Sequence, residues 1–134
     1  MKSSLASRLG LVLAPAMLLA ATVAAKEYSD AATQALDLSK QAIALRSVRG
    51  VGNQTIEVAQ LFRDALVAGG WSDDDVEIVP LEDTAYLIAT WPGSDPSLGP
   101  IVISAHLDVV EARPEEWERD PFTPLVEHGY LLGR

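Results

Sequence analysis

The chain of 134 residues contains no cysteine, so neither a disulfide framework nor a lipid-modified cysteine is available to it. Aromatic residues make up only 6% of the sequence, and there are only two histidines. Basic residues are scarce too, since 10 lysines and arginines stand against 19 aspartates and glutamates. This acidity disfavours nucleic acid and anionic membrane surfaces as partners. The stability has to come from a hydrophobic core.

The first 25 residues have the composition of a secretory signal peptide. Lys2 and Arg8 come first, and residues 9–25 carry no charge and end in small side chains. This pattern predicts an exported protein, periplasmic or secreted, that is cleaved after Ala25. A membrane anchor is the alternative, but the uncharged run has 17 residues and a proline, whereas about 20 residues are needed to span a bilayer. Cleavage would leave residues 26–134 free of the membrane, with a charge of 8 minus 19, or −11.

Two amphipathic helices are predicted at the start of this mature part. Apolar residues recur at helical spacing from Asp30 to about Arg46. After a turn with two glycines, Thr55 is placed to cap a second helix, which ends at Gly69-Gly70. The apolar stripe of the second helix consists of Ile56, Ala59, Phe62 and Leu66.

The hydrophobic period then changes to that of β-strands. Val76 and Ile78 alternate with acidic residues, and Ala85–Trp91 is a continuous β-prone run, so two neighbouring strands are predicted. Residues 92–100 hold three prolines and two glycines, which predicts an exposed loop. The apolar run Ile101–Ala105 is typical of a strand buried on both faces of a sheet.

A second, shorter pair of strands is predicted near the end of the sequence. Two β-prone segments flank His128-Gly129, and glycine adopts positive φ at low steric cost, so a tight hairpin is expected there. Helices followed by strands, with polar residues directly after a buried strand, indicate an α/β fold. In such sheets the ligand site lies beyond the carboxyl ends of the strands.

The sequence His106-Leu107-Asp108 is the strongest candidate for chemistry. On an extended backbone the side chains of His106 and Asp108 project to the same side. A neutral imidazole binds zinc, and a nearby carboxylate can fix its tautomer and raise its basicity. The pair alone is weakly specific, because a surface histidine paired with an aspartate has the same spacing.

The residues around this pair form an ordered series of motifs. An apolar run leads into His106-Leu107-Asp108-Val109-Val110, and Trp117, Asp120-Pro121-Phe122 and Gly129-Tyr130-Leu131-Leu132-Gly133-Arg134 follow. The series resembles the first metal-binding segment of the dinuclear zinc exopeptidase and deacylase family, which includes aminoacylases, carboxypeptidase G, acetylornithine deacetylase and succinyl-diaminopimelate desuccinylase. The family patterns are H-x-D-V-V, W-x-x-D-P-F and G-x-x-x-G-R-G. Glu111 departs from them, since many relatives have proline there.

The resemblance implies a fold, a site and a reaction. Residues 26–134 would be the N-terminal portion of a catalytic domain, truncated, with helices packed on a mixed, largely parallel sheet. His106 would bind one of two zinc ions, for which cobalt or manganese can substitute. Asp108 would be a catalytic-site residue that supports the metal site without binding metal. The implied reaction is hydrolysis of amide bonds in peptides or N-acyl amino acids.

The resemblance also implies what these residues lack. The other metal ligands and the glutamate general base of relatives come after the position of Arg134, so the 134 residues alone are expected to be inactive. A sheet without its later strands is expected to leave an unpaired edge and an uncovered apolar face. Relatives often pair through a separate smaller domain, which would make the intact protein a homodimer.

Alternatives to this interpretation remain open. The chain can be a secreted noncatalytic binding module that keeps the fold without a complete metal site. A serine hydrolase is disfavoured, because no G-x-S-x-G motif is present. Trp117 and Phe122 are expected to pack their loop onto the domain, with a substrate cleft as the alternative. His128 is expected to be a solvated turn residue, and Asp120 a turn former.

Overall fold

The computed structural model describes residues 30–134, and the chain divides into two compact units, residues 1–36 and 37–134. The predicted signal peptide lies outside the described residues. Residues 30–36 of the first unit and residues 37–43 of the second are helical, which confirms the first predicted helix. No helix within residues 30–134 is long and apolar enough to cross a membrane.

The second predicted helix is α2, Thr55–Ala68, and it ends at Gly69 as expected. Its buried residues are Thr55, Val58 and Ala59, whereas Ile56 is 44% exposed. The predicted stripe was therefore wrong at its first member, because the helical period places position 58 over the core instead. Thr55 is also not the cap. It is the first helical residue, and its backbone N–H donates to Asn53 Oδ1 at 2.7 Å.

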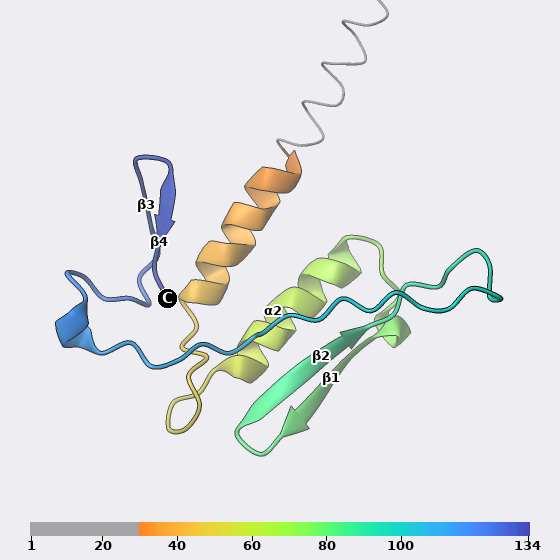
Figure 1. Ribbon diagram of the computed structural model, residues 1–134, viewed down its shortest axis with the longest axis horizontal. Coiled ribbons are helices and arrows are strands. Elements are labelled where there is room, and N and C mark those ends of the chain that lie inside the picture. Colours follow the sequence, from red (N-terminus) through yellow and green to blue (C-terminus); the bar gives the residue numbers. More distant parts are fainter. Residues whose placement is uncertain (1–29) are drawn as a thin grey trace, which may run out of the picture. The chain divides into compact units, whose positions relative to one another are not determined.

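The two neighbouring strands are confirmed as an antiparallel hairpin. A short 3₁₀ turn, η1 (Asp73–Asp75), leads into β1 (Val76–Leu81), which pairs with β2 (Thr84–Ala89) through a turn at Glu82-Asp83. Helix α2 packs against both strands (Figure 1). The core between them is small and consists of Val58 and Ala59 from the helix and Val76 and Ala85 from the strands.

Two contacts of the Arg63 side chain tie the carboxyl half of α2 to η1 and to the start of β1. The guanidinium of Arg63 lies 2.7 Å from the carboxylate of Asp73, and its Nε donates to Val76 O at 3.3 Å. Beyond the helix, the rings of Trp71 and Trp91 meet edge to face with their centroids 5.0 Å apart. These contacts fix the helix along the hairpin, as aromatic and charge-assisted contacts do at a domain edge.

Residues 101–105 do not form the buried strand that their apolar composition predicted. The loop at residues 92–100 is exposed as predicted, but the following run forms no strand and is exposed, with Ile101 at 92% and Ile103 at 92%. A strand is buried only when partner strands and covering helices are present. Within residues 30–134 there are two separate antiparallel two-stranded sheets, and neither includes this run. The implied mixed, largely parallel sheet is therefore not present in the described part of the chain.

The second hairpin agrees with the prediction. A 3₁₀ turn, η2 (Pro114–Glu116), precedes β3 (Leu125–Glu127), which pairs with β4 (Tyr130–Leu132). The two turn residues have positive φ, 52° at His128 and 83° at Gly129. This is the backbone of the two-residue turns that match the twist of a hairpin. His128 is exposed, as expected of a turn residue.

Candidate functional site

The imidazole of His106 and the carboxylate of Asp108 contact each other, as the spacing predicted. His106 Nδ1 lies 3.0 Å from Asp108 Oδ1, and the His106 side chain is 89% exposed. The hydrogen bond from His106 holds the pKa of Asp108 below its usual range. With Nδ1–H donating to this carboxylate, the lone pair of the neutral ring is on Nε2. This geometry fits a metal-binding histidine that is supported by a carboxylate. It fits an exposed ion pair equally well.

The described residues do not complete a metal site around His106. Within residues 30–134, no three histidine, cysteine, aspartate or glutamate side chains gather closely enough to hold a metal ion. A catalytic zinc usually has three protein ligands and an open position for water. The donor set in the described part of the chain therefore does not fit a whole zinc centre.

The backbone that follows Asp108 is held by contacts that no local sequence pattern predicts. Val109 N donates to Ser47 O at 3.1 Å, and the carboxylate of Glu111 forms an ion pair with the guanidinium of Arg46. Arg134 Nε donates to Val110 O at 3.3 Å. Glu111 was noticed in the sequence only as a departure from the family pattern, and the structure gives its side chain a partner.

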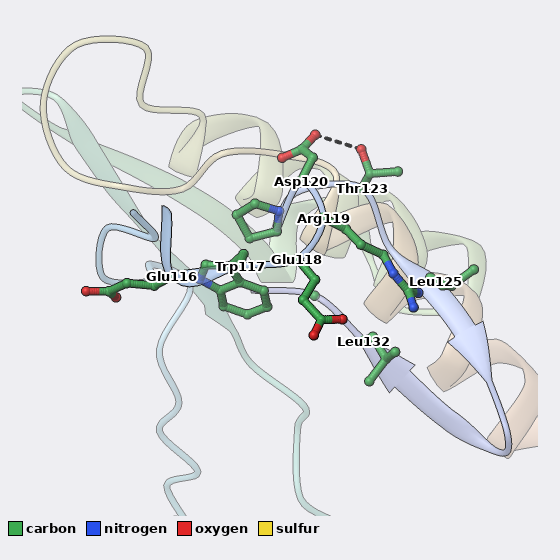
Figure 2. Close-up of a pocket in the computed structure, with 10 residues that line it drawn as sticks. Glu116, Trp117, Glu118, Arg119, Asp120, Thr123, Leu125 and Leu132 are labelled. Atoms are coloured by element: carbon green, nitrogen blue, oxygen red, sulfur yellow. Dashed lines mark hydrogen bonds between the residues drawn. The ribbon is translucent and has the colours of Figure 1, made fainter. Parts of the chain in front are cut away.

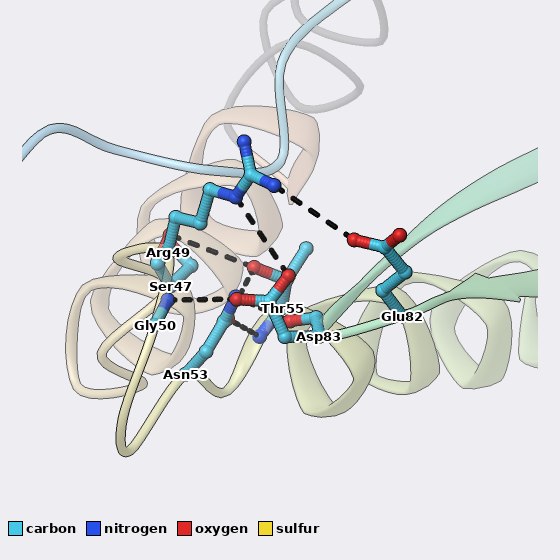
Figure 3. Close-up of polar contacts among 7 residues, drawn as sticks. All are labelled: Ser47, Arg49, Gly50, Asn53, Thr55, Glu82 and Asp83. Carbon is cyan, nitrogen blue, oxygen red and sulfur yellow. Dashed lines mark hydrogen bonds and ion pairs between the residues drawn. The ribbon is translucent and has the colours of Figure 1, made fainter.

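A hollow of about 450 Å³ lies beside Asp108, between the loop before α2 and the β1–β2 turn. It is lined by Arg49, Asn53, Leu81, Glu82, Asp83, Thr84 and Asp108. Figure 3 shows how the loop and the turn are joined: Gly50 N donates to Asp83 Oδ2 at 2.9 Å, and Arg49 lies 3.8 Å from the carboxylates of both Glu82 and Asp83. One guanidinium among three carboxylates leaves this wall acidic, which disfavours an anionic ligand there.

A second hollow, of about 240 Å³, is bounded by the Trp117 loop and the second hairpin (Figure 2). Trp117 and Phe122 are half-buried, and Trp117 lines this hollow with Leu125 and Leu132. Neither residue of the His106–Asp108 pair is among the lining residues.

Asp120 is confirmed as a turn former at the rim of this second hollow. Its carboxylate accepts hydrogen bonds from Thr123 Oγ1 at 2.7 Å and Phe122 N at 3.1 Å. These bonds, the one from Thr123 first, lower the pKa of Asp120.

The chain is similar to parts of two kinds of curated protein. Aminoacylase-1 from Sus scrofa is 34% identical over 98 residues, which are 72% of this chain and 23% of that protein. Human aminoacylase-1 is 31% identical over 98 residues, which are again 72% of this chain and 23% of that protein. The N-fatty-acyl-amino acid synthase/hydrolase PM20D1 from Mus musculus is 51% identical over 45 residues, 34% of this chain and 9% of that protein.

The chain thus spans about a quarter of the length of the aminoacylases it matches. No protein-family profile matches it, and neither does any solved structure. The partial matches support an amidohydrolase family and single out no member of it.

Proposed function

We propose that the whole protein hydrolyses the amide bond of N-acyl amino acids, and that His106 and Asp108 belong to its metal site. The observation that carries the proposal is the 3.0 Å contact between His106 Nδ1 and Asp108 Oδ1 within the ordered motif series of residues 101–134. The names of the similar proteins, aminoacylase and N-fatty-acyl-amino acid synthase/hydrolase, favour N-acyl amino acids over peptides as substrates.

The chemistry of the two side chains supports the roles assigned to them. Asp108 accepts the Nδ1–H of His106, which orients the ring and leaves Nε2 as a metal donor. A bound zinc pair would lower the pKa of a water molecule and polarise the scissile carbonyl. Since no three metal-ligating side chains gather within residues 30–134, the proposal requires further ligands outside the described residues. We also propose export, with residues 1–25 as a cleaved signal peptide, and assembly as a homodimer.

The two histidines of the chain provide a matched test. Amine release from N-acetyl amino acids is measured for the whole protein, together with its zinc content by elemental analysis. His106→Asn is expected to lower kcat/KM by at least about 100-fold and to reduce bound zinc, because a metal donor is removed. His128→Asn is the control, since His128 is exposed in the β3–β4 turn and asparagine tolerates positive φ.

The outcomes separate the proposal from its alternative. Equal activity and equal zinc content in the two variants would contradict the role of His106. A wild-type protein that binds N-acyl amino acids without hydrolysing them would instead favour the noncatalytic binding module.

A further inference from the structure

The loop that joins the two helices, residues 46–54, is closed by reciprocal hydrogen bonds between its ends. Arg46 N donates to Gln54 Oε1 at 2.9 Å, and Gln54 N donates to Arg46 O at 2.8 Å. Across the loop, Arg46 Nη1 donates to Val51 O at 3.0 Å. Hydrogen bonds between the ends of the loop and across it give the loop a defined shape.

The carbonyl group of Ser47 lies where this loop meets the segment after Asp108. Ser47 is buried, and its carbonyl oxygen accepts hydrogen bonds from Thr55 Oγ1 at 3.5 Å and from Val109 N at 3.1 Å. Figure 3 shows the first of these bonds, between Ser47 and Thr55. The residue next to Asp108 is therefore bonded to a buried carbonyl group whose oxygen lies 3.5 Å from Thr55 Oγ1 of helix α2.

The ion pair between Arg46 and Glu111 lies two residues further along the same segment. The Arg46 guanidinium contacts Val51 O with Nη1 and the Glu111 carboxylate with Nη2. Glu111 Oε1 also accepts from Ala112 N at 3.2 Å, and Ala112 is buried. The segment is thus held at positions 109, 110 and 111, by Ser47, Arg134 and Arg46. The run at 101–105 that precedes His106, by contrast, is exposed and belongs to neither sheet.

We infer that Arg46 and Glu111 are positioning residues for the His106–Asp108 pair. The pair lies on a segment that has no strand partners among the described residues. The position of the pair relative to α2 therefore depends on the contacts that the residues directly after Asp108 make with Ser47 and Arg46. The inference rests on the proposed function. An exposed ion pair contributes little to global stability, so its loss should be detected locally and in turnover.

Amide hydrogen exchange at Val109 tests whether the Arg46–Glu111 ion pair holds the segment after Asp108 against Ser47. Glu111→Gln is expected to speed exchange of the Val109 amide about 10-fold, because the ion pair that holds the segment against Ser47 O is lost. Glu116→Gln is the matched control. This control breaks the ion pair between Glu116 and Arg113, whose side chains lie 3.4 Å apart on the same segment. It should leave the exchange rate of the Val109 amide unchanged. Equal exchange rates in wild type and Glu111→Gln would overturn the inference.

Turnover by the whole protein tests the positioning role. Glu111→Arg is expected to lower kcat/KM for N-acetyl amino acids about 10-fold, with an unchanged urea midpoint, because arginine opposes Arg46. Adding Arg46→Glu to this variant restores the opposite charges and should bring kcat/KM back to within about 3-fold of wild type. A merely structural contact would lower kcat/KM only together with the urea midpoint, and the exchange of charges would restore both.

The inference and the proposed function fail in different ways. If wild-type protein hydrolyses the substrate and Glu111→Arg does so equally well, the positioning role is wrong while the proposed function stands. If wild type hydrolyses nothing, the proposed function fails, and Val109 exchange still decides whether Arg46 and Glu111 hold the segment.

Discussion

Val58 is the residue whose truncation should most weaken the packing of α2 on the β1–β2 hairpin. Its side chain is 2% exposed, and the other core residues around it, Ala59, Val76 and Ala85, are small. Val58→Ala removes two methyl groups, about 1.6 kcal/mol of transfer free energy, and small neighbours cannot fill the gap, which adds roughly 1 kcal/mol. The better helix propensity of alanine offsets about 0.5 kcal/mol. The expected net loss is about 2 kcal/mol.

The control for this prediction removes the same atoms at an exposed site. Val51 is fully exposed in the loop before α2, so Val51→Ala should stay within about 0.5 kcal/mol of wild type. Both variants are unfolded in urea and followed by far-ultraviolet circular dichroism, which reports the loss of the helices. A Val58→Ala transition no lower than that of Val51→Ala would refute the argument that these four residues form the core.

Two further predictions concern the ends of the sequence. Gly133→Ala should destabilise the chain by about 1–3 kcal/mol in the same urea assay, because a Cβ there would lie 2.6 Å from Ile43 Cγ2 and 3.2 Å from Pro121 O, at a φ of +153°. Gly99→Ala, with nothing within 4 Å of its Cβ, should leave stability nearly unchanged, and equal effects would contradict the steric explanation. N-terminal sequencing of the exported protein should begin at Lys26, whereas retention of Met1 would contradict the signal peptide.

The elements that were predicted correctly are those fixed by local pattern. Helix α2 and the two hairpins each follow from a hydrophobic period bounded by turn residues that lie close by in sequence, within the window of roughly 11 to 18 residues in which such periods are read. The turn at His128-Gly129 is an example, since positive φ at both residues follows from the two-residue loop. The miss at Ile56 is of the same local kind, because a stripe read from apolar residues alone overlooked the buried Thr55.

The contacts that position the candidate site were not predicted, because they join distant parts of the chain. Arg46 and Glu111 are 65 residues apart in sequence. No local pattern distinguishes a glutamate that will pair with a distant arginine from one that remains solvated. The sequence placed His106 and Asp108 on one side of the backbone, which is a local property, and could not place the segment that carries them against Ser47.

The exposed run at residues 101–103 and the incomplete donor set at His106 have the same physical origin. Three consecutive branched apolar side chains that face water are an unfavourable surface, and such surfaces normally lie against another element. The imidazole that follows them is a donor that needs further ligands if it is to hold zinc. Partner strands and covering helices around 101–105 would bury the apolar side chains, and polar residues at the carboxyl ends of those strands would lie next to His106. One set of additional elements would therefore satisfy both requirements, so the failed burial prediction and the proposed metal role call for the same partners.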